Sequence, residues 1–202
     1  MMIELDRAVE RVQSDGGELV RAVVRHRYDT LPGDLWEALT DPDRMKRWFY
    51  PLSGDLREGG TFQLEGNAGG DILACDPPNL LKLTFGGPDS VVVLRLADAG
   101  AGTELQLEHT VPIAMAGSGA GALFVGPGWD GAFLGLDLFV RGEVAGDPIA
   151  AANSPENLAF ARESVDLWTA VIERSGTATA EEIAAVREMS LAQFAPGSGA
   201  AG

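Results

Sequence analysis

The sequence predicts an α+β fold: one antiparallel sheet, two short helices near its start, a long apolar helix after the last strand and a helical hairpin at the C-terminal end. Residues 19–28 and 103–111 alternate apolar and polar side chains, which is the period of a half-buried strand. Short turns join the strand-like segments between residues 54 and 111, and such turns favour antiparallel pairing. From residue 129 the apolar side chains recur every three or four positions, which is typical of a helix.

The first element is ambiguous. Apolar residues in the segment 3–12 fit a helical stripe about as well as a strand, and we favour a strand because a Gly-Gly turn connects it to the strand at 19–28. A short helix is expected at 35–39. Asp41 is followed by Pro42, and aspartate and proline are favoured at the N-cap and at the first position of a helix. This pair predicts a second helix that runs through Trp48.

The middle of the chain contains strands separated by turns rich in glycine, proline and aspartate. These strands are expected at 61–65, 71–75, 80–85, 91–96 and 103–111. A flexible apolar loop is expected at 112–127 and could act as a flap beside the long helix. That helix is expected at 129–143 because Trp129, Phe133, Leu136 and Val140 share one of its faces.

The segment beyond residue 146 has a helical composition. Ser154 before a proline predicts a helix start, Gly176 predicts its end, and Thr179 with Glu182 forms a capping box for a last helix. We therefore divide the chain into a domain at 1–146 and a helical extension at 147–202 with a frayed tail. Isolated helices of this length are marginal in water, so we expect the hairpin to pack on the domain and to contribute to a homodimer.

The composition excludes several classes of protein. Thirty Asp and Glu residues stand against fifteen Lys and Arg, giving a formal net charge of −15, which disfavours nucleic acid and anionic membrane surfaces as partners. The charged N-terminus does not resemble a signal peptide, and no run of about eighteen apolar residues predicts a membrane span. The single cysteine, Cys75, excludes an internal disulfide. We expect a soluble, cytoplasmic protein.

Few residues have side chains suited to catalysis, metal binding or specific recognition of a ligand. His26 and His109 are the only histidines, and both lie on the apolar faces of their strands, where an imidazole could orient a ligand or be an ordinary core residue. A metal site would need a further ligand such as Asp137, so we predict no metal and no cofactor. The glycine-rich segment 117–121 lacks the spacing of a phosphate-binding loop, and Ser118 lacks the context of a nucleophile elbow. We assign no catalytic residue.

At three places the chain resembles the family named for the activator of Hsp90 ATPase, over roughly residues 19–145. The opening motif of that family resembles the block Leu35-Trp36-Glu37-Ala38-Leu39-Thr40-Asp41-Pro42, followed by Trp48-Phe49. Its last strand resembles Thr103-Glu104-Leu105-Gln106-Leu107-Glu108-His109, and the start of its long helix resembles Gly128-Trp129. The resemblance implies a START-like, or Bet v 1-like, helix-grip fold. It also implies a cavity for a hydrophobic ligand under the long helix, and no universal catalytic residue.

The expected function is therefore to bind a small hydrophobic or amphipathic molecule in a cavity between the sheet and the long helix. Two alternatives remain open: a module that regulates a chaperone of the Hsp90 type, although Lys46 and Lys82 are the only lysines, and an enzyme similar to the cyclases and aromatases of the fold, with a histidine as general base. The residues expected to line the cavity are His26, Trp48, Phe62, Leu64, Leu107, His109, Trp129, Phe133 and Leu136.

Overall fold

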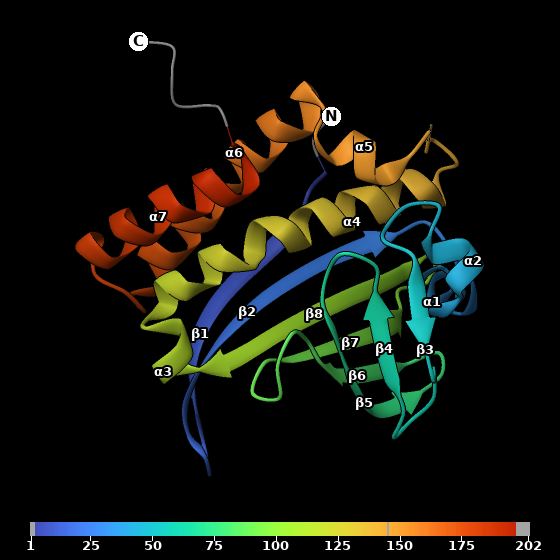
Figure 1. Ribbon diagram of the computed structural model, residues 1–202, viewed down its shortest axis with the longest axis horizontal. Coiled ribbons are helices and arrows are strands. Elements are labelled where there is room, and N and C mark those ends of the chain that lie inside the picture. Colours follow the sequence, from blue (N-terminus) through green and yellow to red (C-terminus); the bar gives the residue numbers. More distant parts are fainter. Residues whose placement is uncertain (1–2, 145, 197–202) are drawn as a thin grey trace. The chain divides into compact units, whose positions relative to one another are not determined.

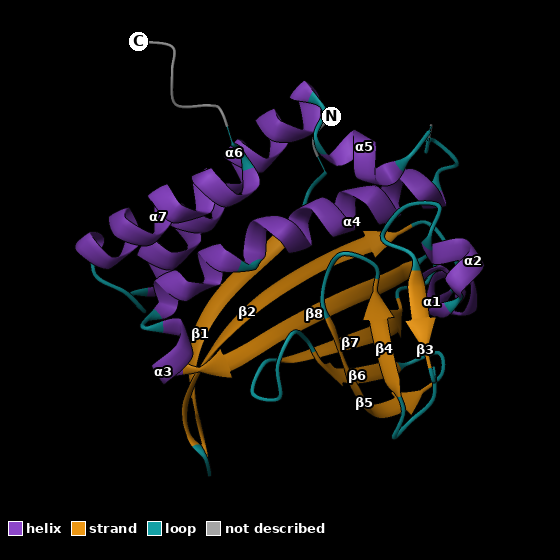
Figure 2. Cartoon of the chain, in the orientation of Figure 1, coloured by secondary structure: helices purple, strands orange, loops and turns teal. Residues whose placement is uncertain are grey.

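The computed structural model describes residues 3–144 and 146–196 and has an α+β fold (Figures 1 and 2). The strands are β1 (Asp6–Ser14), β2 (Gly17–Tyr28), β3 (Leu52–Gly54), β4 (Thr61–Leu64), β5 (Gly69–Asp76), β6 (Leu80–Thr84), β7 (Val91–Asp98) and β8 (Thr103–Pro112). The helices are α1 (Pro32–Thr40), α2 (Pro42–Met45), α3 (Ile113–Ala116), the 3₁₀ helix η1 (Gly119–Phe124), α4 (Gly126–Val140), α5 (Pro148–Ala152), α6 (Pro155–Ser175) and α7 (Ala180–Phe194). The predicted frayed tail begins at Pro196, and its residues 197–202 lie outside the described residues.

The eight strands form one sheet in the order β1-β2-β8-β7-β6-β5-β4-β3. The strands from β3 to β7 pair antiparallel with their sequence neighbours, as the short turns predicted. Strand β2 lies beside β8 and not beside β3, which follows it in the sequence. The two strands with the clearest alternation of apolar and polar side chains are therefore neighbours. The segment 3–12, ambiguous from the sequence, contains the start of strand β1. The predicted fold class is confirmed: a long helix, α4, follows the last strand of an antiparallel sheet, as in a helix-grip fold.

The three predicted helix caps are confirmed, whereas α1 and α4 each begin three residues before their predicted starts at 35 and 129. The Asp41 side chain accepts a hydrogen bond from the Arg44 backbone N–H at the start of α2. Ser154 caps α6, and the capping box of Thr179 with Glu182 begins α7. Each cap satisfies backbone N–H groups that have no partner inside the helix.

Three local predictions are wrong. The segment 112–127 contains α3 and η1, and Gly119–Leu123 are buried, so it is not a flexible loop. The second short helix ends at Met45 and does not run through Trp48. The strand β3 was not predicted from the sequence. Runs of Gly and Ala have no clear apolar period, which is why the helices in the first segment could not be recognised.

The chain forms two compact units, each described here by itself. Unit 1 comprises residues 1–24, 110–131 and 152–202, and unit 2 comprises residues 25–109 and 132–151. The elements β2, β8 and α4 contribute residues to both units.

Unit 1 contains the predicted helical hairpin. Helices α6 and α7 pack against each other, α6 also contacts β1, and both helices contact η1. The predicted stripe on α6 is buried at Val165, Trp168 and Ile172. A Cβ atom on Gly126 would overlap the Trp168 ring, so only glycine allows α4 to approach α6 this closely. The Ser190 hydroxyl on α7 donates a hydrogen bond to the Leu123 carbonyl at 2.7 Å. The hairpin is therefore an integral part of unit 1.

Unit 2 holds most of the sheet and the C-terminal part of α4. Helix α1 contacts β7 and buries Leu35. The Trp48 indole N–H donates to the Ala38 carbonyl at 3.0 Å, which ties the segment after α2 to α1. The Tyr28 hydroxyl, fully buried, donates to the Phe133 carbonyl of α4 at 3.2 Å. Buried polar atoms of the tryptophan and tyrosine are thus satisfied by backbone carbonyls.

One segment, Gly119–Val140, is long and apolar enough by length and composition to cross a membrane. The segment contains Asp130 and Asp137, so it is not the uninterrupted apolar run that the sequence prediction considered. The segment joins η1 to α4, and it buries Leu123 and Asp130 within unit 1 and Leu136 within unit 2. A single segment of this kind is weak evidence for a membrane span, because the core helix of a folded domain satisfies the same criterion.

Candidate ligand-binding site

Eight of the nine predicted lining residues belong to unit 2, and Trp129 belongs to unit 1. All eight except His26 are buried. The eight are His26, Trp48, Phe62, Leu64, Leu107, His109, Phe133 and Leu136. Their burial fits either a cavity wall or a solid core, so their contact with a ligand stays a prediction.

His109 on β8 is a buried polar group among aromatic rings. Its Nε2 atom shares a 2.8 Å hydrogen bond with the Ser90 hydroxyl. The edge of the Phe85 ring contacts the imidazole at a centroid distance of 5.9 Å, and Phe85 in turn stacks on Phe62 at 6.3 Å. Burial lowers the pKa of His109 to about 4 because the charged form loses its hydration. At neutral pH the imidazole is therefore uncharged and holds one N–H donor and one acceptor.

Ser90 was not recognised from the sequence. It follows the turn at 86–89 and precedes β7, and it reaches His109 because β7 and β8 are neighbours in the sheet. Alternation placed His109 on an apolar face, but no sequence signal indicated which residue of β7 lies opposite it. Strand register decides such pairs.

His26 lies in a second polar cluster of unit 2. Its Nε2 atom is 3.7 Å from Oδ1 of Asp137 on α4, and its ring meets the Tyr28 ring edge-on at 4.7 Å. Asp137 also pairs with Arg141 at 3.0 Å. Burial, together with the nearby Asp137 carboxylate, raises the pKa of Tyr28 well above its ordinary value, so the phenol stays protonated. Asp137, considered only as a metal ligand from the sequence, is instead a partner of His26.

The two histidines contact different residues. His26 contacts Tyr28 and Asp137, whereas His109 contacts Ser90 and Phe85.

These clusters can hold a polar group of a ligand but offer no metal site. No group of three or more His, Cys, Asp or Glu side chains suited to a metal ion occurs within residues 3–144 and 146–196. A neutral imidazole beside a hydroxyl can donate or accept one hydrogen bond, which orients a ligand without binding a charge.

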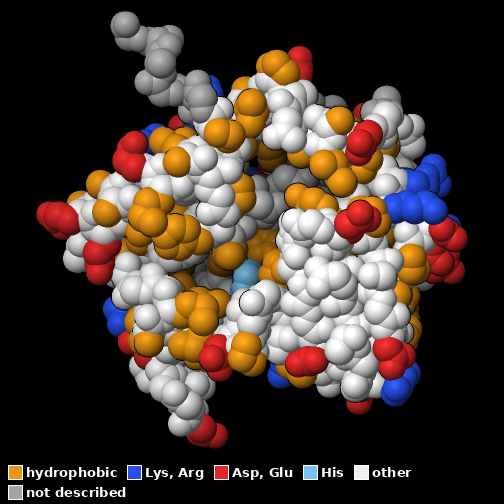
Figure 3. Space-filling model, in the orientation of Figure 1, with side chains coloured by type: hydrophobic (Ala, Val, Ile, Leu, Met, Phe, Trp, Pro, Cys, Tyr) orange, Lys and Arg blue, Asp and Glu red, His pale blue; other side chains and the backbone are white. Residues whose placement is uncertain are grey.

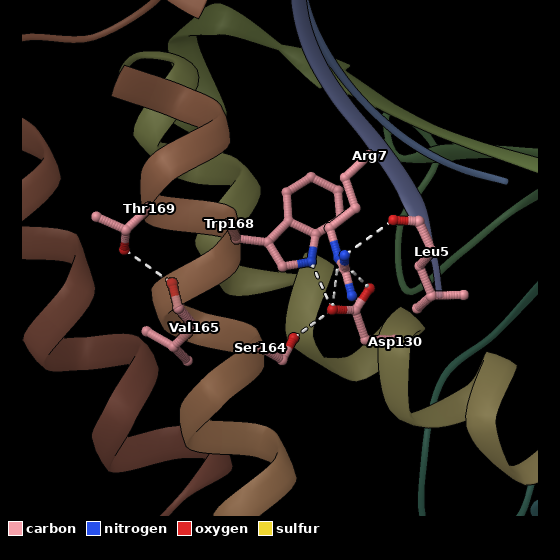
Figure 4. Close-up of polar contacts among 7 residues, drawn as sticks. All are labelled: Leu5, Arg7, Asp130, Ser164, Val165, Trp168 and Thr169. Carbon is pink, nitrogen blue, oxygen red and sulfur yellow. Dashed lines mark hydrogen bonds and ion pairs between the residues drawn. The ribbon is translucent and has the colours of Figure 1, made fainter. Parts of the chain in front are cut away.

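Unit 1 contains a different polar cluster, centred on Asp130 of α4 (Figure 4). The Arg7 side chain of β1 forms an ion pair with it, with Nε 2.9 Å from Oδ2. The Ser164 hydroxyl and the Trp168 indole N–H of α6 both donate to the same carboxylate, the latter at 3.1 Å. Arg7 also donates to the Leu5 carbonyl at 3.0 Å. This cluster connects β1, α4 and α6, and its geometry is that of a structural ion pair.

The Asp130 cluster is fully buried and compensated. Asp130 has no exposed surface, and the Arg7 side chain is 8% exposed. Burial raises the pKa of Asp130, and Arg7, Ser164 and Trp168 oppose that shift. Trp129, predicted to line the cavity, is the residue before this aspartate and is partly buried. The indole that donates within this cluster is that of Trp168.

An antiparallel sheet followed by a long helix after the last strand is the arrangement of the START-like helix-grip class, and this chain has that arrangement. The model of the family described as Activator of Hsp90 ATPase homolog 1-like protein matches residues 29–138. The chain belongs to this family, which confirms the resemblance inferred from the motifs.

Solved structures agree with this assignment. The crystal structure of CalU16 from Micromonospora echinospora is similar at 40% sequence identity and a TM-score of 0.69, covering 83% of this chain and 98% of that one. Its solution NMR structure gives 39% identity and a TM-score of 0.70, with 85% and 97% covered. EF2215 from Enterococcus faecalis, a conserved protein of unknown function, shares the fold at 14% identity and a TM-score of 0.59, with 81% and 91% covered. A search among curated proteins found no match.

Proposed function

We propose that this protein binds a small hydrophobic or amphipathic molecule in the interior of the helix-grip fold. The observation that carries the proposal is the buried His109–Ser90 pair, whose imidazole contacts the Phe85 ring, which in turn stacks on Phe62. Binding sites for small molecules are mostly apolar and aromatic, with a few polar groups that orient the ligand. Membership in a START-like family supports the same conclusion.

The ligand class follows from the charge state of this pair. His109 is neutral at neutral pH, so it offers a hydrogen bond but no charge to the ligand. An uncharged molecule with a hydroxyl, carbonyl or ether oxygen would suit an apolar setting that offers polar atoms but no charge. A ligand with an ionised group there would lose its hydration without gaining an ion pair.

Binding of the neutral fluorescent probe N-phenyl-1-naphthylamine to the full chain tests the proposal. We expect a saturable rise in fluorescence and a change in the imidazole NMR signals of His109 on binding. Ser90→Ala should weaken binding several-fold, whereas Ser53→Ala, on the exposed strand β3, should not. Saturable binding that leaves the His109 signals unchanged, or the absence of saturable binding, would contradict the proposal. Native mass spectrometry of the purified protein would identify a molecule carried from the cell.

A second candidate function is acid–base catalysis at His26. The specific observation is that His26 is partly exposed and lies 3.7 Å from Asp137, a carboxylate that can hold an imidazole in one orientation. A general base of this kind would act on an acidic C–H or O–H of a bound ligand. Conversion of a ligand identified by mass spectrometry, lost in His26→Gln but kept in His109→Gln, would favour catalysis over simple binding.

Two further expectations concern partners. The family description refers to activators of Hsp90 ATPase, and ATPase assays with Hsp90 would test that role. On the face drawn in Figure 3, acidic side chains are scattered and basic ones are few, which does not favour an acidic partner surface. The predicted homodimer is tested by sedimentation of the full chain. Leu167 on α6 and Met189 on α7 are exposed hydrophobic residues that such a contact could cover.

A further inference from the structure

Unit 2 has a small open pocket that shares no residue with the predicted interior site. It lies among α1, the segment around α2 and the C-terminal end of α4, and its volume is about 170 Å³. Its charged lining residues are Asp34, Arg44 and Arg47, and its ring is that of Phe139. Thr30, Ala38 and Val140 complete the lining. The pocket therefore combines cations with an apolar wall.

The charge of this lining is opposite to that of the whole protein. Two arginines and one aspartate give the lining a formal charge of +1, whereas the chain carries −15. Arg44 is held in place by an ion pair with Glu37 at 3.3 Å and by a hydrogen bond from its Nη1 to the Asp34 carbonyl at 3.2 Å. The second cation in the pocket has a different environment.

Arg47 forms no ion pair with any residue in the described part of the chain. Its guanidinium carbon lies 5.0 Å from the centroid of the Phe139 ring, a cation–π contact. The N–H groups of a guanidinium point outwards in the plane of the group, so a guanidinium that lies over a ring can still donate two of them to one carboxylate. Arg47 is thus an oriented cation without a carboxylate partner, in a protein that has an excess of carboxylates.

We propose that this pocket binds a small monoanionic amphipathic molecule, a carboxylate joined to an aromatic or short aliphatic body. The carboxylate would pair with Arg47, and the body would contact Phe139 and Val140. Asp34 disfavours a second negative charge on the ligand, which restricts the class to monoanions. The volume is below the 300–1,000 Å³ typical of sites for drug-sized ligands, so the ligand is of about the size of benzoate.

Titration of the ¹⁵N-labelled full chain with benzoate tests this proposal by NMR. Benzamide, which has the same shape without the charge, and benzylammonium, which has the opposite charge, are the matched ligands. We expect saturable shifts with benzoate at α1, α2 and Phe139, with a millimolar dissociation constant as for other fragments, and much weaker shifts with the other two.

A pair of variants assigns the binding to Arg47. Arg47→Met keeps the aliphatic stem and should weaken benzoate binding roughly tenfold or more, as expected for the loss of a charge-assisted hydrogen bond. Arg57→Met is the control, because Arg57 is highly exposed and pairs locally with Asp55 at 2.8 Å. Equal effects of the two variants would show only a general charge effect and would overturn the proposal.

Two other outcomes would also overturn it: benzamide that binds as well as benzoate, or benzoate shifts confined to the surroundings of His109 and Phe62. The second outcome would leave the proposed interior ligand site intact. Conversely, absence of binding by the neutral probe in the interior would leave this pocket untouched, since the two sites share no lining residue.

Discussion

Asp130 in unit 1 and His109 in unit 2 are both buried polar side chains, but the protein stabilises them in opposite ways. Asp130 has an ion-pair partner on β1 and two further side-chain donors on α6. His109 shares a hydrogen bond with Ser90 and contacts the Phe85 ring, and among the causes of its pKa shift no charged group of the described residues compensates its burial. The aspartate is surrounded by charge and donors, whereas the histidine has lost its charge through burial.

The difference indicates different roles. A carboxylate with all of its strong partners supplied by the protein has little left to offer a ligand, and removing one partner leaves an uncompensated buried group. A neutral imidazole with a hydroxyl beside it can exchange partners at small cost. Unit 1 therefore uses its buried polar group for structure, and the proposed ligand site lies in unit 2.

The largest expected effect is the loss of the Arg7–Asp130 pair. Arg7→Met should lower the free energy of unfolding by about 3–5 kcal/mol, because Asp130 stays buried without its cation. Urea denaturation measures this change. The double variant Arg7→Met with Asp130→Leu removes both charges and should recover part of the loss. If Arg7→Met is as stable as the parent, the ion pair is not structural and the comparison fails.

The pH dependence of stability should separate the two groups. The folded pKa of His109, about 4, is below its unfolded value near 6.5. Its contribution is thus fully present above pH 6.5 and is lost as the pH falls towards 4, by on the order of 3 kcal/mol in total. Asp130 has the opposite sign: its folded pKa is raised, so its contribution is lost as the pH rises through that value.

Urea denaturation between pH 7 and pH 4.5 checks this prediction. The parent protein should lose more stability over this range than His109→Gln, which has no titrating group at that position. Parallel pH profiles for the two proteins would show that His109 is not held neutral by burial.

Two glycines of α4 allow a comparison of the stability effect of a glycine-to-alanine change at a tightly packed position and at an open one. Gly126→Ala should cost about 1–3 kcal/mol because the new methyl group would overlap the Trp168 ring. Gly131→Ala should instead stabilise by up to about 1 kcal/mol, since nothing lies near the new Cβ atom and alanine favours the helix. Thermal unfolding of both variants measures the difference, and a loss of stability in Gly131→Ala would contradict it.

The smallest expected effect compares two serines. Ser90→Ala leaves the buried His109 without its hydroxyl partner and should cost about 1–3 kcal/mol. Ser164→Ala removes one of several donors to Asp130 and should cost about 1 kcal/mol. Denaturant unfolding of the two variants should therefore rank Ser90→Ala as the less stable. The reverse ranking would mean that the Asp130 cluster depends on every donor.

Features that depend on a few neighbouring residues could be predicted from the sequence. The caps at Asp41 and Ser154 and the capping box at Thr179 each involve residues three positions apart, so the local pattern is sufficient. Strand alternation likewise assigned the buried face to His109.

Contacts between distant residues could not be predicted in this way. Arg7 and Asp130 are 123 positions apart, and Ser90 and His109 are 19 positions apart on strands whose register no local signal reveals. The 3₁₀ helix η1 forms in a sequence of small residues because the tertiary structure buries it, notably at Gly119, which lies tightly against Thr177. The composition likewise does not reveal that Arg47 stacks on Phe139, since the partner lies far along the chain.

The contact between β1 and α6 has a consequence for synthesis on the ribosome. Arg7 must wait for Asp130 and Ser164 to emerge before its cluster can form. At about 5–20 residues per second this delay is roughly 10–30 s. During that time β1 and β2 have no α6 to cover them, and until residue 112 has emerged they also lack β8. Exposed strand edges recruit other strands, so the nascent N-terminal hairpin is the part of this protein most in need of protection by a chaperone.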